Sequence, residues 1–464
     1  MESISKKERG GDIRLSSVRV CFLATNLCFI YLSKKRRNDL AGALAVAMLF
    51  GFAEKSNAME LADGKITING FLKNWTGYRF GFYSHERDSG LSIMRTVLQL
   101  EAEVKLNEVA SLVGIFRIAR EPEYNLEDDA KDLGLFDGDE MDEEVMRELY
   151  LAWQPTENFW TAVGKQQVAW GDLAGIGLRV MDNINALDVR WHYALDNFED
   201  VRKPLIMLNS IYSIPSIEGN LQLVWVPGLE DTWERVTSIY ITPAHRYGLN
   251  NLFGGAFGGG DKPGDFPPIG AFEPPTSGNV NGITRKISDS SIGMRFQKTS
   301  GGLTWAISDY YTFDQNPDLN GNYNRLNIFG ITGNWYDQYT DGVWLFEAGY
   351  FHDQSYGGND GTLKQEDTYK WGLRYDRRTF FYWLPAGDRR SLLSGFQVIQ
   401  TVIPDNDDFD NQNDTGVGGE TTDTVGTLYL NFGVANDRVQ FFWNTNWWFE
   451  REFGVGLFFV EWRP

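Results

Sequence analysis

The chain has very little cysteine, and it has no long apolar run after its first 58 residues. Its two cysteines, Cys21 and Cys28, lie near the N-terminus, so residues 59–464 contain none. That absence excludes disulfide bonds, thiolate metal sites and covalent haem attachment from residues 59–464. In the same residues no run approaches the roughly 20 apolar residues that a transmembrane helix needs, so no membrane-spanning helix is expected there.

Histidine is also scarce, which argues against an enzyme. The four histidines, His85, His192, His245 and His352, are far apart in the sequence. None lies in an H-x-S pattern of the kind that would place a serine nucleophile beside its base. We therefore expect no catalytic residues and no cofactor.

The N-terminal region resembles a leader rather than part of a fold. Residues 34–37 are Lys-Lys-Arg-Arg, an apolar run follows from Leu40 to Phe52, and residues 56–58 offer a small-x-small cleavage site. This pattern predicts a secretory signal peptide over residues 34–58, preceded by an over-extended start at residues 1–33. Cleavage would leave one domain, residues 59–464, and would change the net charge from −20 to −25, because ten basic and five acidic residues lie in the leader.

Alternation of apolar and polar residues predicts long β-strands. In the stretch "MRTVLQLEAEVKL", residues 94–106, every second residue is apolar or Thr, and the interleaved positions carry four charges. A period of two places these sets on opposite faces of a strand. About sixteen such segments occur, near 65–80, 92–107, 110–120, 145–154, 158–170, 204–214, 218–227, 289–298, 303–313, 323–336, 343–352, 366–380, 391–403, 422–435, 438–448 and 453–462.

The connections between these segments alternate between long and short. Long connections at 81–91, 121–144, 171–203 and 228–288 are separated by short ones at 107–109, 155–157 and 215–217. Outer-membrane barrels have this anatomy, with short periplasmic turns and longer extracellular loops. We therefore predict an all-β, transmembrane, antiparallel up-and-down barrel of 14 to 16 strands in the outer membrane of a Gram-negative bacterium. Its predicted lumen-facing residues include Arg95, Gln99, Glu101, Glu103, Lys105, Arg295, Lys370 and Arg374.

Aromatic residues are abundant and gather at the ends of the predicted strands. They make up 14% of the chain, with 16 Trp. Such rings prefer the level of the lipid headgroups and form girdles at both edges of a membrane barrel. Trp153, Trp160, Trp335, Trp344 and Trp443 are examples near short turns.

One segment, Gly164 to Ile214, resembles the outer-membrane barrel family catalogued as domain of unknown function 1302. The family's strand end G-[RK]-Q-x-x-x-W-G, its N-P-x-D turn and its E-D-x-R-x-P entry to the next strand have counterparts here. These are Gly164, Lys165, Gln166, Trp170 and Gly171, then Asn185 and Asp188 with Ala186 in place of Pro, then Glu199, Asp200, Arg202 and Pro204. The resemblance implies a porin-like barrel, and favours transport of hydrophobic or lipid-like compounds with periplasmic or inner-membrane transporter partners.

The connection 171–203 is a candidate constriction of paired charges inside the lumen, as in selective pores. An ordinary surface loop held by turns and ion pairs is the alternative. The residues of this constriction or family motif are Lys165, Gln166, Trp170, Asp172, Arg179, Asp182, Asn185, Asp188, Arg190, Glu199, Asp200 and Arg202.

Two other connections have unusual composition. The connection 228–288 is rich in Gly and Pro, and it is expected either to plug the barrel or to lie outside as an irregular loop. Residues 121–148 hold thirteen Asp or Glu. Within them Asp137, Asp139 and Asp142 offer hard oxygens to Ca²⁺ or Mg²⁺, although a solvated acidic loop is the simpler interpretation.

These observations predict a monomeric porin-like channel for small compounds, surrounded by outer-membrane lipid and lipopolysaccharide, with no nucleic-acid partner. The alternative is a structural sleeve around a periplasmic or multihaem cytochrome partner in an electron conduit. Such a partner would bring its own haem-binding motifs from a separate chain.

Overall fold

The computed structural model describes residues 22–26, 59–79, 90–120, 145–175, 178–186, 202–228, 287–315, 323–357, 363–381, 391–404, 422–434, 439–449 and 453–462. Within them, sixteen strands of eight residues or more form one sheet. They are β3 (Ile66–Arg79), β4 (Gly90–Lys105), β5 (Ala110–Arg120), β6 (Met146–Thr156), β7 (Phe159–Gln166), β10 (Leu205–Ile214), β11 (Gly219–Val226), β12 (Ser291–Ser300), β13 (Leu303–Phe313), β14 (Arg325–Asp337), β15 (Gly342–Gly357), β16 (Leu363–Phe380), β17 (Ser391–Val402), β18 (Thr422–Val434), β19 (Val439–Trp448) and β20 (Phe453–Trp462).

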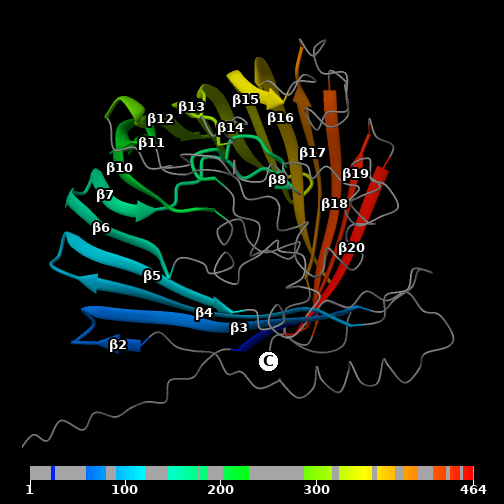
Figure 1. The fold of residues 1–464 in the computed structure, drawn as a ribbon, viewed down its shortest axis with the longest axis horizontal. Helices are drawn as coiled ribbons and strands as arrows, with labels where there is room; N and C mark the ends of the chain where they lie inside the picture. The colour runs from blue at the N-terminus through cyan, green and yellow to red at the C-terminus, as the bar shows by residue number, and fades with distance from the viewer. Residues whose placement is uncertain are drawn as a thin grey trace, which may run out of the picture.

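Each long strand pairs antiparallel with its neighbours in chain order, with β7 followed directly by β10. The sheet therefore has the predicted up-and-down topology, and every predicted segment corresponds to one strand. Figure 1 shows it curving from β3 at the bottom, past β7 on the left and β14 at the top, to β20 on the right. Among the smaller elements outside this series are β2 (Met59–Leu61), which pairs with β3, and the 3-10 turns Pro215–Ile217 and Ile287–Asp289.

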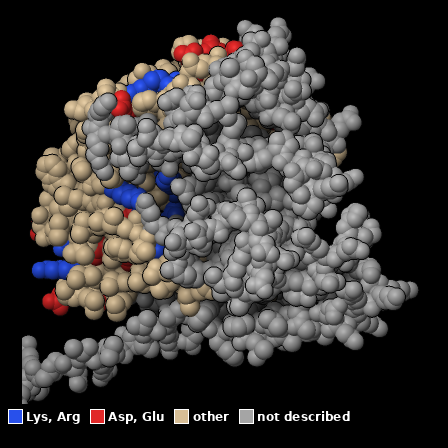
Figure 2. All heavy atoms as spheres, viewed as in Figure 1, with Lys and Arg blue, Asp and Glu red and all other residues tan. Residues whose placement is uncertain are grey.

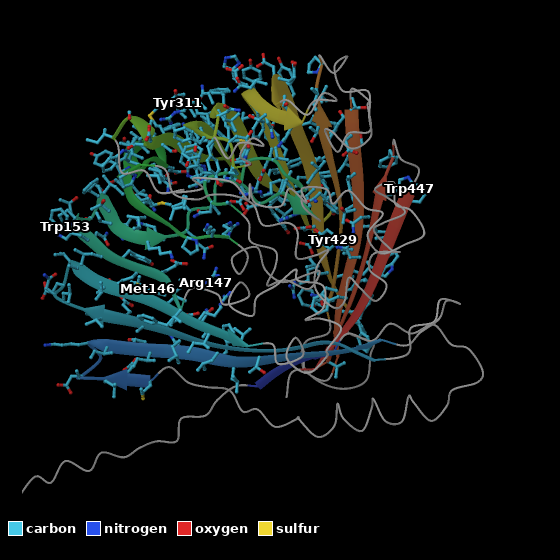
Figure 3. All side chains as sticks on the ribbon, viewed as in Figure 1. Met146, Arg147, Trp153, Tyr311, Tyr429 and Trp447 are labelled. Atoms are coloured by element: carbon cyan, nitrogen blue, oxygen red, sulfur yellow. The ribbon has the colours of Figure 1, made fainter. Side chains whose placement is uncertain are left out.

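The strands bury polar side chains and expose large apolar ones, the reverse of a water-soluble sheet. On β4, Gln99 is 6% exposed, whereas Leu98 and Leu100 on either side are 36% and 45% exposed. On β15, Glu347 is 3% exposed beside Phe346 at 38%. In Figure 3 the apolar or aromatic Trp153, Tyr311 and Trp447 lie at the outer edge, whereas Arg147 and Tyr429 lie inside. The polar face is therefore the concave one.

The strand registers join these exposed side chains into one continuous outer face. Leu151 stands opposite Val163, and Val163 stands opposite Leu208. A register shift of one residue at any pair would move a whole strand's apolar set inward. The same face continues through Leu223, Met294, Ile307, Ile331, Phe346, Leu373, Val398 and Leu428.

Aromatic rings gather at both ends of the outer face. At the short-turn end, the Trp344 ring lies 6.4 Å from Trp335, 4.7 Å from Tyr375 and 5.8 Å from Phe396, between ring centroids. At the long-loop end, Tyr350 and Tyr369 lie 5.1 Å apart. Trp160 does not belong to these belts, because its register opposite Ile211 places it on the inner face with Asn209.

The edges of the sixteen-strand series meet at a short additional strand. β1 (Phe22–Asn26) pairs antiparallel with β20 and parallel with β3, and it belongs to the segment predicted to be a leader. An even number of antiparallel strands leaves β3 and β20 running in opposite directions, as the antiparallel strands of a bacterial barrel require. Removal of the leader would thus leave two edges with matching antiparallel polarity.

The chain departs from the sequence expectation after β7. The strand predicted over 158–170 ends at Gln166, and the residues that follow turn into the concave side of the sheet. There, Trp170, Leu173, Val180 and Met181 belong to the buried apolar core. Figure 1 shows β8 (Ala174–Gly175) of this segment lying inside the curve of the sheet. Within the described residues, no helix is long and apolar enough to cross a bilayer.

We predict that one added charge has different effects on the two faces of β4. If the outer face meets lipid, Leu100→Arg should destabilise the inserted protein by about 2–4 kcal/mol, because position 100 is on that face. Glu103→Arg, on the inner face of the same strand, should be nearly neutral. Urea unfolding in lipid vesicles measures both, and equal losses for the two variants would contradict this orientation of the sheet.

Candidate functional site

The candidate site is the segment after β7, described over residues 167–175 and 178–186, which we call the inward segment. Its apolar residues pack against the concave side of β10 to β17, with Leu205, Val224, Tyr310 and Ile399 among their neighbours in one buried cluster. A hydrogen-bonded pair of two-residue strands, β8 and β9 (Leu178–Arg179), gives the segment a local hairpin. Among the side chains that the structure describes, none from the wall opposite, β3 to β6 and β18 to β20, belongs to this cluster.

The carboxylate of Glu347 on β15 binds the inward segment to the concave side of β10 to β17, which we call the wall. Glu347 Oε1 accepts hydrogen bonds from the backbone N–H groups of Asp172, at 2.5 Å, and Leu173, at 3.0 Å. Its Oε2 accepts from the N–H of Met181 at 3.0 Å. A turn that leaves the sheet loses its ladder partners, so these buried donors need another acceptor. Glu347 supplies it for both arms of the segment.

Glycines on the wall make room for the segment's side chains. A methyl group added at Gly330 would lie 2.2 Å from Met181 Sδ, and one at Gly349 would lie 2.8 Å from the same atom. Gly293 faces the Trp170 ring and Gly372 faces Leu173 in the same way. The two glycines 330 and 349 stand opposite each other on β14 and β15. The wall thus has a recess that fits this segment.

Arg179 holds the two sides of the segment together from within. Its Nη1 donates to the carbonyl oxygens of Asp182, at 2.6 Å, and Asn185, at 2.8 Å. Its Nη2 donates to Gln315 Oε1 at 2.6 Å, and Gln315 Nε2 donates to the carbonyl of Asn183 at 2.7 Å. Burial lowers the pKa of Arg179 to about 10, so the guanidinium stays charged at neutral pH.

Asp182 lies between two arginines. Its Oδ2 accepts from both Nε and Nη2 of Arg202, each at 2.8 Å, and Arg202 is buried on the far side of the connection. Burial raises the pKa of Asp182 above its usual range, while the charges of Arg179 and Arg202 oppose that rise. Arg202 thus pairs directly with this carboxylate, whereas Arg179 bonds the Asp182 carbonyl and acts on the carboxylate through its charge.

An amide network connects the segment to β7, β10 and β11. Trp170 Nε1 donates to Gln222 Oε1 at 3.0 Å, and Gln222 Nε2 donates to Asn209 Oδ1 at 2.9 Å. Gln166 Nε2 donates to the carbonyl of Met207 at 3.2 Å. At the exit, Asn185 Oδ1 accepts from the N–H of Val168 at 2.9 Å, and its Nδ2 donates to the carbonyl of Lys203 at 2.8 Å.

The structure thus brings together most of the predicted motif residues that it describes. Gln166, Trp170, Arg179, Asp182, Asn185 and Arg202 are all buried. Asp172 is exposed on the segment, and its carbonyl accepts from Arg374 Nη1 at 2.7 Å. Lys165 is the exception, because it stands opposite Ile206 and Leu149 on the outer face, opposite to that of Gln166. Asp188, Arg190, Glu199 and Asp200 lie outside the described residues.

The predicted lumen-facing residues fall on the concave face wherever their side chains are described. Gln99 is buried, Glu101 and Glu103 are half-buried, and Lys105 is exposed near the short turn. Arg295 lies near Asp172 and Glu347, and the Lys370 ammonium lies 4.4 Å from the centre of the Phe351 ring. Figure 2 shows basic side chains gathered in the hollow near the centre of the view. The side chain of Arg95 lies outside the described residues.

The sequence analysis missed Glu347, Met181, Gln222 and Gln315, although one of them had a signal. Glu347 is the lone charge on the inner face of a strand that otherwise presents Leu345, Gly349 and Phe351 there. A lone charge in such a setting implies a specific partner. Met181 and the two amides had no such signal, because their partners come from distant strands.

Among the described residues, His352, Asp353 and Asp367 form a group with metal-ligand spacing, on the outer face at the long-loop end. The residues predicted to bind Ca²⁺ or Mg²⁺, Asp137, Asp139 and Asp142, lie outside the described part of the chain, as does nearly all of the 228–288 connection.

Comparisons with known proteins find similarity only among solved structures. No family model matches the chain, and no curated protein matches it. An OmpF structure from Salmonella typhi aligns with a TM-score of 0.44 and 10% identity, covering 87% of this chain and 100% of that one. OmpT of Vibrio cholerae aligns at 0.39 and 10%, covering 85% and 98%. A porin of Rh. blastica aligns at 0.37 and 10%, covering 86% and 99%.

We predict that the hydrogen bonds to Glu347 keep the inward segment bound to the concave side of the sheet. Glu347→Ala leaves three buried N–H groups without an acceptor, each costing about 1–3 kcal/mol. Amide hydrogen exchange of a peptide covering 172–181 should therefore accelerate strongly, whereas exchange in β15 itself should not. Glu347→Gln, which keeps one carbonyl oxygen, should give an intermediate rate. Unchanged exchange in both variants would contradict the role assigned to this carboxylate.

Because Met181 packs closely against Gly330, we predict that substitutions at these two positions partly compensate for each other's loss of stability. Gly330→Ala should destabilise the protein by about 1–3 kcal/mol through overpacking against Met181. Met181→Ala should cost about 2–5 kcal/mol by leaving a cavity. The double variant should recover part of the summed loss, because the added methyl enters the vacated space. Unfolding midpoints of the four proteins measure this coupling, and strict additivity would refute the contact.

Proposed function

We propose that the protein is an outer-membrane channel of a Gram-negative bacterium that passes small solutes through a hydrated lumen narrowed by the inward segment. The observation that carries this proposal is the inverted burial of the strands: apolar side chains cover the outer face and polar ones the inner face. Only a surrounding of lipid makes that distribution favourable, because exposed apolar area costs about 25 cal/mol per Å² in water. A hydrated interior then accommodates the charges.

The number of strands supports a channel. Sixteen strands enclose more space than their own side chains fill, so porins of this size retain an aqueous passage. The inward segment is fastened to β10 through β17 and leaves the inner face of β4 and β5 uncovered by its apolar cluster. That face carries the half-buried Glu101 and Glu103. We place the passage between this face and the segment.

The described side chains favour water-soluble solutes. Trp170, Leu173 and Met181 face the wall and are buried, whereas Asp172 is exposed. The polar passage that results supports small polar or charged solutes more than the hydrophobic or lipid-like compounds that the family resemblance implies. We propose no enzymatic activity and no cofactor for this channel.

The alternative of a sleeve around a cytochrome has no observation in its favour. A partner inside the barrel would need the space that the inward segment partly occupies. Partners in the periplasm or inner membrane, and the monomeric state, remain predictions from the sequence.

Planar-bilayer recording of the purified protein tests the channel. We expect discrete conductance steps, and we expect Glu347→Ala to raise the conductance or its noise, because the segment that narrows the lumen is released. The matched control is Thr427→Ala, which changes a buried inner-face residue of β18 whose hydrogen bond goes to Asn446 of β19. A protein that inserts into the bilayer but never conducts would refute the proposal.

A further inference from the structure

Two arginines of the inner face lie beside the inward segment, on the side of the short turns. The segment covers Gly293 on β12 and Gly372 on β16. Arg295 and Arg374 follow two residues later on the same strands and the same face, nearer the short-turn end. Asp172 of the segment lies near both, because its carbonyl accepts from Arg374 Nη1 at 2.7 Å and its charge acts on Arg295.

Arg295 has few hydrogen-bond partners for a half-buried guanidinium. Its Nε is buried and bonds to no other described group, and its Nη2 donates to Thr332 Oγ1 at 3.5 Å, the limit of a hydrogen bond. A guanidinium has five N–H donors, and a charge that is taken out of water needs acceptors for them. Arg295 therefore retains donors for a ligand that lies beside the segment.

Asp172 carries the complementary charge. Its side chain is exposed, and no hydrogen bond or ion pair joins its carboxylate to another residue that the structure describes. Arg374 does not neutralise this carboxylate directly, because it bonds the Asp172 carbonyl and its Nε lies 3.2 Å from Asp376 Oδ2. An acidic group and a basic group thus lie close together without forming an ion pair, and both are available to a ligand.

The balance of charge around these residues disfavours a simple anion. Arg295 and Arg374 are opposed by three carboxylates, those of Asp172, Glu347 and Asp376. The oxygens of Glu347 are already occupied by backbone N–H groups. An anion at Arg295 would meet this excess of negative charge, and a cation at Asp172 would meet the neighbouring guanidinium groups. A molecule that carries both charges close together suits both groups.

We propose that Asp172 and Arg295 bind small α-amino acids beside the inward segment, with the ammonium at Asp172 and the carboxylate at Arg295. This inference rests on the proposed channel and names the class of solute that it accepts. An ammonium supplies three N–H donors, and the fork of a guanidinium matches a carboxylate. One carbon joins the two charges of an α-amino acid, so with hydrogen bonds of about 2.8 Å at each end it spans groups that are too far apart to pair directly. The inner face next to Arg295 presents Ala306, Ser308 and Thr332, whose small side chains favour a small ligand.

Ligand binding to the full chain in a non-ionic detergent tests this proposal without depending on conduction. The probes are L-alanine, propionate, which lacks the ammonium, and L-alaninamide, which lacks the carboxylate. Saturation-transfer NMR gives their dissociation constants. We expect L-alanine to bind, and we expect each truncated probe to bind about tenfold more weakly or less, as loss of a charged hydrogen bond predicts.

Each variant should remove one of the two interactions. Arg295→Gln should weaken L-alanine by about tenfold without weakening L-alaninamide, and Asp172→Asn should weaken L-alanine by about tenfold without weakening propionate. Arg295→Lys, which keeps the charge but not the fork, should give an intermediate loss. A displaced segment would instead weaken all three probes together, and amide hydrogen exchange of residues 172–181 shows whether the segment stays in place.

The matched control is Arg378→Gln, which removes another base from the inner face of β16, one that donates to Ser391 Oγ. It should leave the affinity for L-alanine unchanged. The proposal is wrong if propionate or L-alaninamide binds as tightly as L-alanine, if both variants weaken all probes alike, or if Arg378→Gln and Arg295→Gln behave alike. A parent protein that conducts but does not bind L-alanine would refute this site alone, whereas one that binds L-alanine but never conducts would refute the channel.

Discussion

The pairing of the long strands with their neighbours in chain order is the constraint on which the rest of the structure depends. In the proposed lipid surroundings no water reaches the outward side of a strand, so its N–H and C=O groups need partners within the sheet. The sixteen long strands meet this need by antiparallel pairing in chain order. Once the registers are set, one face is apolar all the way along the sheet, and the charges have only the concave side to occupy. The polar interior is thus a consequence of how the backbone is paired.

The inward segment is the one described place where the chain leaves this pairing and enters the concave space. Its backbone donors then need new acceptors, and Glu347 provides them from the wall for Asp172, Leu173 and Met181. Its apolar side chains need a surface against which they can be buried, and the recess at Gly330 and Gly349 provides one for Met181. Hydrogen bonds to Glu347 and close packing against the glycines therefore both hold the inward segment in place. The width of the proposed passage depends on both.

The outer face carries a second division, between its two ends. The short-turn end finishes in packed aromatic rings around Trp344, whereas the long-loop end adds Arg325, His352 and two carboxylates to its tyrosines. Aromatic rings are suited to either interface of a membrane. Outward charges occur toward both ends, with Lys298 at the short-turn end and Arg325 at the long-loop end. The long-loop end differs in carrying a histidine and two carboxylates together.

Alternation in the sequence was sufficient to predict the strands, their number and the direction of each face, because a period of two is a local property of the chain. It also indicated that the connection after β7 was unusual, since Gln166, Trp170, Arg179, Asp182 and Arg202 stood together in one motif. It misjudged where β7 ends and on which face Lys165 and Trp160 lie, because a turn or a bulge resets the alternation without a clear local signal. Only the tertiary structure decided that the segment folds inward and is held by Glu347, and that His352 lies beside Asp367. Those contacts join residues from different strands, and their proximity follows from sheet register, which no single strand encodes.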